Sequence, residues 1–368
     1  MKFTCQRDTI LKEIEYANNF TSQRNALSIL SYVLLENYQN VLTIKSSDTK
    51  LSFMTSFPVS TEIPGSITVT CDKFLAILKT LPSSDIVFSD ENEKMTISPI
   101  GDKSVKFNLK TISADKFTQI KFLEDDTFFS LSQRDFFDMI DKTTFAVSTD
   151  ETKYFLTGAY LEKKDGQLIM VATDGKRLSC IKKIFEQEVP DFPASIIPVK
   201  FLQMLTLIGS GEGIFSLSIG VGVINANING HLISSSLVSG NYPAYERVIP
   251  KDFTYECKIK KEDMLTALTR VSLFVENNSK KIFLDINQDG ILVSGENTEV
   301  GDAREIVGCE YSGPEARMSF NYNFLLTPLK KIESEYFRIC YNTTTSAIGV
   351  LPDPERDYIF VIMPMHGW

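Results

Sequence analysis

Histidine is scarce in this sequence. Only His231 and His366 occur among 368 residues. This scarcity argues against histidine-rich metal sites and Ser-His-Asp catalysis, because both need an imidazole held beside specific partners. Carboxylate catalysis stays open, although 47 acidic residues make any chosen pair a weak indication. We expect no catalytic residue, no metal and no cofactor.

Paired cysteines and long apolar runs are missing as well. The six cysteines are widely separated, and no Cys-x-x-Cys occurs. Isolated cysteines usually behave as small buried apolar residues in a reducing compartment. The N-terminal MKFTCQRDTILKEIEY lacks the apolar core of a signal peptide, and no run approaches the roughly 18 apolar residues of a membrane span. We therefore expect a cytoplasmic protein.

Glycine-rich nucleotide loops are also absent. The stretch VATDGKRLS at 171–179 holds a Gly-Lys pair, but Met170 stands where a phosphate loop needs glycine, and Arg177 where it needs Ser or Thr. Alternating apolar residues flank Asp174-Gly175, which is typical of a β-hairpin turn. The glycine-rich run 209–213 lies between a predicted helix and a predicted strand, so we interpret it as the turn that ends the helix.

The overall composition is that of an ordinary globular protein, with 43% hydrophobic and 23% charged residues. A net charge of −9 argues against binding nucleic acid with the whole surface, but it permits a local basic lining. The length predicts two or three domains, at roughly 150 residues each.

An internal repeat is the most informative feature. FTCQRDTIL at 3–11, FSLSQRDFF at 129–137 and CKIKKEDML at 257–265 each combine a short alternating strand with apolar residues at helical spacing. A second helix start recurs around Phe74, Phe201 and Phe324. Pairs of strands lie between these landmarks, one of them around VATDGKRLS. Both landmarks recur at a period of roughly 125 residues.

The repeat predicts three similar α+β domains, near 1–122, 123–252 and 253–368. Each should hold two helices and several antiparallel strands, with the helices on one face, because no long crossover connections occur. Three such domains in a row leave unpaired sheet edges at both ends. Closure into a ring would remove those edges.

Further motifs carry a family resemblance over the whole chain. They are KYFLTG at 153–158, VATDGKRLS at 171–179, GNYPAYERVIP at 240–250, YSG at 311–313 and VIMPM at 361–365. In this order they resemble the bacterial DNA polymerase III beta subunit, the processivity sliding clamp. The resemblance implies a DNA clamp fold: a head-to-tail homodimer whose six domains form a ring, with helices lining the hole and sheets outside.

The resemblance also implies that the ring encircles duplex DNA without reading sequence and performs no catalysis. Basic side chains of the inner helices would face the phosphates through water. The basic candidates are Arg24, Lys73, Lys79, Lys142, Lys200, Arg270 and Lys330, and Tyr154 is a further candidate for the DNA-facing surface. The family often has an arginine beside Lys200, where this chain has Val199.

The VATDGKRLS turn would then form one wall of a pocket for peptides of the replicative polymerase, the clamp loader and other partners. Methionine and leucine would supply an adaptable apolar floor. Lys176 and His366 depart from the family pattern, which commonly has His and Arg there. The implied pocket residues are Phe155, Leu156, Thr173, Gly175, Lys176, Arg177, Leu178, Pro243, Arg247, Val248, Asn321, Phe324, Thr345, Ala347, Met363, Pro364, Met365 and His366.

The homodimer contact is expected between the first and third repeats, where an apolar centre is surrounded by opposite charges. The first repeat would contribute Lys103, Lys106, Phe107 and Leu109. The third would contribute Leu273, Phe274, Glu299, Asp302 and Glu305.

Two other classes of function remain open at this stage. An enzyme with an active site between domains would need a converging acid cluster, and none recurs across the repeats. A scaffold that binds only proteins would lack a basic lining and would not be retained on circular DNA.

Overall fold

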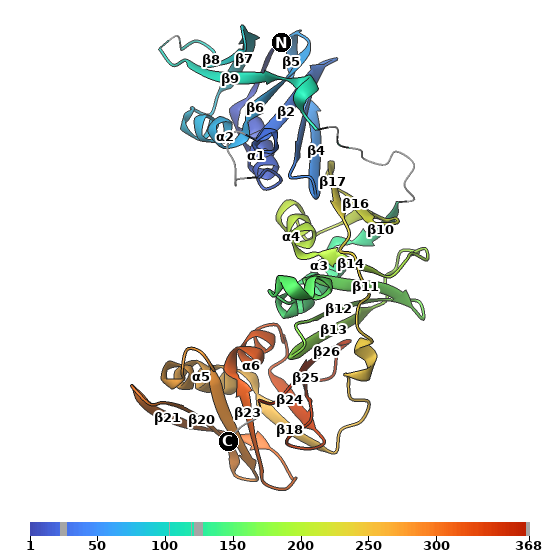
Figure 1. Cartoon of the computed structure of the whole chain (residues 1–368), viewed down its shortest axis with the longest axis vertical. Coiled ribbons are helices and arrows are strands. Elements are labelled where there is room, and N and C mark those ends of the chain that lie inside the picture. Colours follow the sequence, from blue (N-terminus) through green and yellow to red (C-terminus); the bar gives the residue numbers. More distant parts are fainter. Residues whose placement is uncertain (23–27, 103, 119, 121–127, 366–368) are drawn as a thin grey trace. The chain divides into compact units, whose positions relative to one another are not determined.

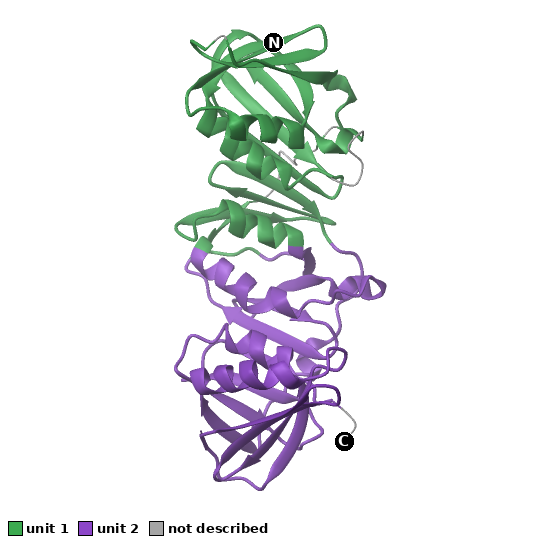
Figure 2. Ribbon diagram, turned by 90° about the vertical axis from the view of Figure 1, so that its left-hand side faces the viewer, with its two compact units in different colours: residues 1–133, 187–190, 200–237 green, residues 134–186, 191–199, 238–368 purple. Residues whose placement is uncertain are grey.

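A computed structural model describes residues 1–22, 28–102, 104–118, 120 and 128–365. The chain forms two compact units (Figure 2). Unit 1 comprises Met1–Gln133, Gln187–Pro190 and Lys200–Leu237, and unit 2 comprises Arg134–Glu186, Asp191–Val199 and Val238–Trp368. The first repeat therefore lies in unit 1, the third in unit 2, and the middle repeat contributes to both.

The first repeat follows the order strand, helix, five further strands, a second helix and three final strands (Figure 1). Its elements are β1 (Lys2–Gln6), α1 (Arg7–Asn18), β2 (Tyr32–Tyr38), β3 (Val41–Ser47), β4 (Leu51–Pro58), β5 (Ser60–Ile63), β6 (Gly65–Thr70), α2 (Cys71–Thr80), β7 (Asp85–Glu91), β8 (Lys94–Pro99) and β9 (Phe107–Ser113).

The middle repeat has the same order of helices and strands, except that its described residues include no strand equivalent to β5. Its elements are β10 (Phe129–Ser132), α3 (Gln133–Thr143), β11 (Gly158–Lys164), β12 (Gln167–Thr173), β13 (Arg177–Lys183), β14 (Ser195–Pro198), α4 (Val199–Ile208), β15 (Ile214–Ile219), β16 (Val223–Ile228) and β17 (His231–Ser236). Short 3-10 turns η3 (Thr144–Ala146), η4 (Glu151–Leu156) and η5 (Tyr245–Arg247) accompany them.

The third repeat completes the pattern. Its elements are β18 (Tyr255–Lys260), α5 (Lys261–Val271), the 3-10 turn η6 (Ser272–Phe274), β19 (Lys281–Asn287), β20 (Gly290–Asn297), β21 (Gly301–Val307), β22 (Cys309–Glu310), β23 (Ala316–Asn321), α6 (Tyr322–Leu329), β24 (Tyr336–Tyr341), β25 (Ile348–Asp353) and β26 (Tyr358–Ile362). Two helices per repeat and the three recurring strand pairs are thus confirmed.

The helices form where apolar residues recur at helical spacing. In α1, Ile10, Ile14 and Ala17 lie one turn apart and are buried, so that one face packs against the sheet. In α4, most apolar side chains are buried, and the helix ends where Gly209 begins the predicted glycine-rich turn. Within the part of the chain that the structure describes, no helix is long and apolar enough to cross a membrane.

All named strand pairs are antiparallel, as predicted. Unit 1 holds one sheet of 13 strands, and unit 2 holds a sheet of nine strands and a sheet of four. Consecutive repeats are joined through these sheets. In unit 1, β17 of the middle repeat pairs with β4 of the first, as in Ile233 opposite Phe53. In unit 2, β26 of the third repeat pairs with β13 of the middle, as in Val361 opposite Leu178. We call these contacts the first joint and the second joint.

Candidate functional site

The VATDGKRLS stretch forms the predicted hairpin between β12 and β13. Gly175 adopts a φ of 87°, a conformation that glycine tolerates better than other residues. The Asp174 carboxylate accepts hydrogen bonds from the backbone N–H groups of Lys176 and Arg177, at 2.9 and 3.0 Å. The Thr173 hydroxyl donates to the Arg177 carbonyl at 2.6 Å and accepts from the Gly175 N–H. Side chains at both sides of the turn therefore hold its shape.

Arg177 is held by three internal partners. Its Nε lies 3.0 Å from Asp174 Oδ2, and its Nη2 donates to the Phe145 carbonyl at 2.7 Å. Its guanidinium carbon also lies 4.9 Å from the centre of the Phe324 ring, within the range of a cation–π contact. These partners come from the hairpin, η3 and α6. Arg177 is therefore an element of the site's architecture, with much of its donor capacity already in use.

The C-terminal segment is hydrogen-bonded to the hairpin and to β23. The Met363 N–H donates to the Lys176 carbonyl at 2.9 Å, and the Met365 N–H donates to the Ser319 carbonyl at 2.8 Å. The Ser319 hydroxyl donates in turn to the Met365 carbonyl at 3.0 Å. Met363 is 37% exposed, whereas Pro364 is buried. The segment thus presents apolar surface beside the hairpin while its backbone is held in place.

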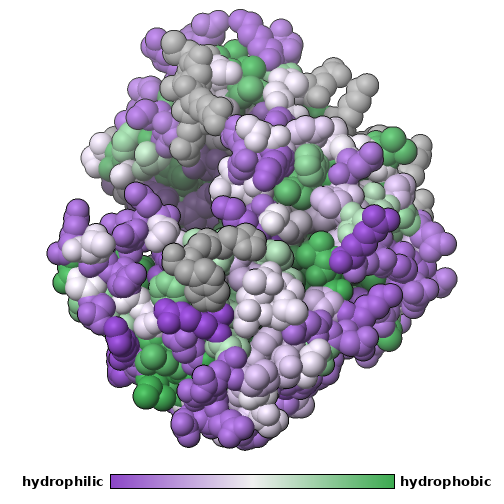
Figure 3. Space-filling view, turned by 60° about the horizontal axis from the view of Figure 1, so that its bottom comes forward, coloured by the Kyte–Doolittle hydropathy of each residue, from purple (hydrophilic) through white to green (hydrophobic). Residues whose placement is uncertain are grey.

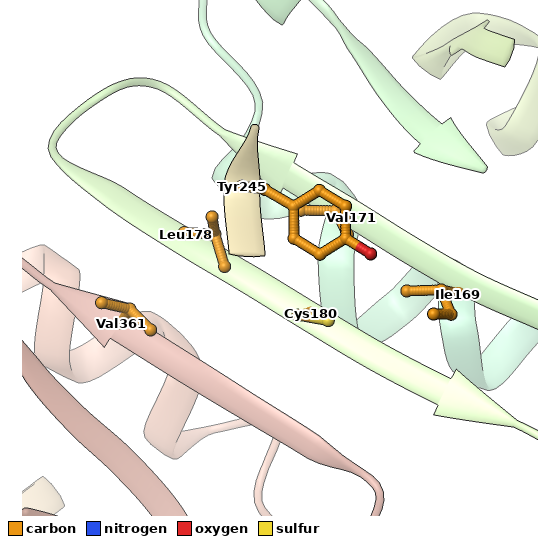
Figure 4. Packing of buried hydrophobic residues seen from close by; sticks show 6 residues of the cluster. All are labelled: Ile169, Val171, Leu178, Cys180, Tyr245 and Val361. Atoms are coloured by element: carbon orange, nitrogen blue, oxygen red, sulfur yellow. The ribbon is translucent and has the colours of Figure 1, made fainter. Parts of the chain in front are cut away.

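A compact apolar cluster lies beneath the hairpin (Figure 4). Figure 4 shows side chains from β12, β13 and β26, with one tyrosine ring from η5 lying against them. The cluster consists of Ile169, Val171, Leu178, Cys180, Tyr245 and Val361. Ala347 packs against it. The cluster brings together the three sequence motifs that the resemblance places at the pocket.

Tyrosines anchor the GNYPAYERVIP segment to the hairpin. Tyr242 stacks on Tyr160 with ring centres 4.8 Å apart, and its hydroxyl donates to the Val171 carbonyl at 3.4 Å. The Tyr245 hydroxyl donates to Glu162 Oε1 at 2.6 Å. Burial, together with Glu162, raises the pKa of Tyr160 to about 12. These hydroxyls are donors at neutral pH, and sequence reasoning had not assigned Tyr160 or Glu162 any role.

The predicted pocket residues differ in accessibility. Leu156, Thr173, Leu178 and Pro364 are buried and form the base. Phe155, Arg177, Asn321, Phe324, Ala347 and Met365 are partly exposed, and Gly175, Lys176, Pro243, Arg247, Val248, Thr345 and Met363 are exposed. His366 lies outside the described residues. The contacts above link the hairpin, the C-terminal segment and Phe324, and the structure gives no such direct link for Thr345.

A separate cavity of about 580 Å³ opens near the same cluster. Cys180, Ile249 and Ile359 line it, together with charged residues such as Arg338 and Glu256. Within the described part of the chain, none of the predicted pocket residues lines this cavity. The predicted peptide site is therefore an exposed surface over an apolar base, distinct from this cavity.

Most of the candidate DNA-facing residues are exposed. Lys73, Lys79, Tyr154, Lys200, Arg270 and Lys330 are all accessible, and Arg24 lies outside the described residues. Lys200 is 2.8 Å from Asp48, Lys79 is 3.1 Å from Glu15, and Arg270 is 3.0 Å from Glu305. Exposed pairs of this kind are weak and screened by salt, so these cations can still turn to an external phosphate.

The prediction for Lys142 is wrong. This lysine is only 3% exposed, and its ammonium group is enclosed by Asp138, Glu333 and the ring of Tyr358. The sequence placed it near the end of an amphipathic helix, where a lysine is usually solvated. The third repeat covers this end of α3, which helix periodicity cannot reveal.

The predicted dimer residues that the structure describes are partly or fully exposed. Leu273 is 74% exposed, and Phe274, Phe107 and Leu109 are partly exposed. Lys106, Glu299 and Asp302 are exposed, Glu305 pairs with Arg270, and Lys103 lies outside the described residues. Val300 and Ile306, 65% and 72% exposed, belong to the same region and were missed. Exposed apolar residues on the edge strand β21 were the signal. On the face shown in Figure 3, hydrophilic residues predominate and hydrophobic ones form small separate groups.

The cysteine thiols offer no reactive group of note. Burial raises the pKa of Cys5, Cys180 and Cys340 to about 12 in each case, so these thiols stay protonated at neutral pH. Among the described residues, no cluster of three or more His, Cys, Asp or Glu has the arrangement of a metal site.

Comparison with known proteins decides the family. Three family models match in chain order: the N-terminal domain of the DNA polymerase III beta subunit at residues 1–121, its central domain at 130–244 and its C-terminal domain at 246–366. The beta sliding clamp of Treponema pallidum is 34% identical over 369 residues, which cover 99% of each chain. The chain belongs to the DNA polymerase III beta-subunit family. The resemblance seen in the sequence motifs is thus confirmed.

Solved sliding clamps share the fold along the whole chain. The sliding clamp from Pseudomonas aeruginosa, solved bound to griselimycin, is 28% identical, with a TM-score of 0.93 and 100% of each chain covered. The sliding clamp from Bartonella birtlesii, also solved with griselimycin, is 26% identical with the same TM-score and coverage. The clamp fold is therefore confirmed, and so is the expectation that the chain is a processivity factor and no enzyme.

Proposed function

We propose that two copies of this chain close head to tail into a ring around duplex DNA, and that the hairpin site of unit 2 holds peptides of the replicative polymerase, the clamp loader and other partners. The processivity role follows from family membership. The residues assigned to each surface are the proposal.

The strand pairing at the two joints is the main observation that supports the proposed dimer. The hairpins β3–β4, β12–β13 and β20–β21 are equivalent in the three repeats, and so are the last strands β9, β17 and β26. Within the chain, β4 pairs with β17 and β13 pairs with β26. Among the described residues, β21 pairs only with β20, and residues 107–110 of β9 pair only with β8. A second copy would complete a third joint, β21 with β9, at each end.

The side chains beside these two strands suit such a joint. Exposed Leu273, Val300 and Ile306 accompany β21, and burying them would remove apolar surface from water. Phe107 and Leu109 lie on β9. Lys106 beside β9 and Asp302 on β21 supply opposite charges that orient the contact.

The exposed cations Lys73, Lys79, Lys200, Arg270 and Lys330, with Tyr154, are proposed to face DNA. All five cations belong to helices α2, α4, α5 and α6 or to the residue that follows them. The whole chain has a net charge of −9, so a few basic residues on these helices would hold DNA loosely and without sequence preference.

The proposal also includes the domain boundaries and the location of the protein in the cell. The domains are placed at 1–122, 123–252 and 253–368, which is supported by the repeated order of strands and helices. The protein is placed in the cytoplasm, where bacterial DNA replication takes place.

Retention on DNA tests the ring directly. The protein should stay on nicked circular DNA through gel filtration after loading, and linearising the DNA should release it, because a ring can leave only over an end. A protein that binds circular and linear DNA equally, or that sediments as one chain at micromolar concentration, contradicts the ring.

A further inference from the structure

A cluster of charged side chains, centred on one buried lysine, lies at the second joint. Its members come from α3, β13 and the segment after α6, and the ring of Tyr358 on β26 closes it. We call it the joint cluster; it comprises Asp135, Asp138, Lys142, Lys183 and Glu333. It therefore connects the middle repeat to the third repeat within unit 2.

Lys142 is the centre of the joint cluster. Its ammonium group bonds Asp138 on its own helix and Glu333 of the third repeat, the latter at 3.0 Å. It also lies 4.9 Å from the centre of the Tyr358 ring. Burial alone would lower the pKa of Lys142, but the two carboxylates outweigh burial and raise it, so the side chain stays charged. Because Lys142 is only 3% exposed, its charge depends mainly on these partners for stabilisation.

The remaining members extend the same arrangement. Lys183 on β13 lies 2.7 Å from Asp138 and 3.2 Å from Asp135. Asp138 is thus shared between two lysines, and it links α3 to β13 as well as to the third repeat. Lys331 bonds Asp141 at the periphery.

The chain segment around Lys142 also supports the peptide site. The Lys142 carbonyl accepts a hydrogen bond from the Ser179 hydroxyl, two residues beyond Arg177 on β13. The Phe145 carbonyl, three residues after Lys142, accepts from Arg177 Nη2 at 2.7 Å. The Phe145 ring packs edge-on against Phe360 of β26, with ring centres 5.7 Å apart. Moving the end of α3 would therefore move Arg177 and the strand that leads to Met363.

We propose that Lys142 is a positioning residue for the partner-peptide site: by tying the end of α3 to Glu333, it holds the hairpin of the middle repeat and the C-terminal segment of the third in binding register. This inference rests on the proposed function of that site. Lys142 touches no peptide, and it acts through Arg177 and through the hydrogen bond from Met363 to Lys176.

The charge of Lys142 is what the proposed positioning role requires. An apolar residue in its place would leave Asp138 paired with Lys183 alone and would remove the contact that ties α3 to Glu333 of the third repeat. Backbone pairing of β13 with β26 would hold the repeats together, but the angle between the end of α3 and the third repeat would no longer be set.

The test compares variants of the full-length protein by calorimetric titration with a polymerase tail peptide at 25 °C. Lys142→Met keeps length and removes charge, and we expect it to weaken peptide affinity about tenfold, or about 1.4 kcal/mol. Lys142→Arg should restore most of the affinity. Lys182→Met is the matched control, because Lys182 lies on the same strand β13 but is exposed and belongs to neither site; its affinity should stay unchanged.

Hydrogen–deuterium exchange separates positioning from general stability. In Lys142→Met, the segment 361–365 should exchange several-fold faster, while β3 and β4 in unit 1 should exchange as in the parent protein. Glu333→Gln serves as a second variant if Lys142→Met fails to fold, and it should weaken binding in the same direction.

The outcomes are distinct. If the parent protein binds no peptide, the proposed function fails. If the parent binds and both Lys142→Met and Glu333→Gln bind as tightly with unchanged exchange, the positioning role is overturned. Equal loss in Lys182→Met would also overturn it, because the effect would then follow charge and not geometry.

Discussion

The first and second joints use the same backbone pairing but different side chains. At the first joint, Phe53 stacks on Phe20 at 4.9 Å and lies 5.8 Å from His231, whose Nε2 is 2.8 Å from Glu13. At the second joint, Phe360 packs edge-on against Phe145, and the joint cluster adds charged contacts between the repeats. The backbone pairing is the same at both joints, and the side chains around the paired strands make the joints different.

In the proposed function, only the second joint carries surface for a partner peptide. Its strands β13 and β26 lead directly into Arg177 and Met363, whereas β4 and β17 lead to no comparable arrangement that we identify among the described residues. If the proposed peptide site is right, the two equivalent joints have diverged, so that the first only holds two repeats together and the second also binds a partner. The predictions below separate these two roles.

Emptying the core of each joint should give the largest effect. Phe53→Ala and Phe360→Ala remove buried rings, and each should lower the free energy of unfolding by about 3–5 kcal/mol. Only Phe360→Ala should also weaken peptide binding, because its ring packs on Phe145. Urea unfolding followed by titration under folded conditions measures both effects. Tyr38→Ala, at an exposed position, is the control. Similar loss of peptide binding in the Phe53 variant would erase the proposed division of roles.

Removing residues 363–368 should abolish one side of the recognition surface. Peptide affinity should fall at least about tenfold, or about 1.4 kcal/mol, with the dimer retained, because the core strands end at Ile362. Met363→Ala or Met365→Ala should act in the same direction more weakly. Titration calorimetry measures the affinity, and sedimentation measures the dimer. Unchanged affinity would mean that the hairpin is only a turn.

Weakening the polar contact of the first joint should cost less. Glu13→Gln keeps the shape but loses the carboxylate that faces His231 Nε2, and a loss of about 1 kcal/mol in unfolding free energy is expected. Peptide affinity should not change. Glu15→Gln on the same helix, whose pair with Lys79 is exposed, should have almost no effect. Equal losses in the two variants would show that burial of the pair is unimportant.

Acid should weaken the second joint through Asp138. Burial alone would raise its pKa, but hydrogen bonds from Lys142 and Lys183 outweigh burial and lower it below the ordinary 3.8. A lowered pKa stabilises the folded chain at pH above about 3.8, and this stabilisation disappears as pH falls through the lowered value. Asp138→Asn should therefore reduce stability at neutral pH and lose less on acidification. Thermal midpoints at several pH values test this, and parallel curves for the two proteins would refute it.

Local patterns accounted for much of the fold. The apolar spacing of Ile10, Ile14 and Ala17 predicted α1, and the same spacing recurred in α3 and α5. Asp174-Gly175 between alternating apolar runs predicted the hairpin. These signals lie within a few residues of one another, so they can be recognised without knowing what packs against them.

The candidate site was predictable only in part. The motifs indicated the hairpin, the tyrosine segment and the C-terminal residues, because the resemblance carried them over. The roles of Phe145, Glu162 and Ser319 carried no signal, because their partners lie far away in the sequence and the contacts depend on how the strands pair.

Lys142 shows where the sequence stops and the tertiary structure begins. In sequence it is one more lysine on an amphipathic helix, as Lys73 and Lys79 are, and the amino-acid order determined the helix, the repeat and the hairpin. Only the fold decided that Glu333, 191 residues away, and Tyr358 would cover this lysine and leave the others exposed. The physical reason is that the edges of neighbouring repeats pair through backbone hydrogen bonds, which carry no local signature, and that pairing selects which charges are buried.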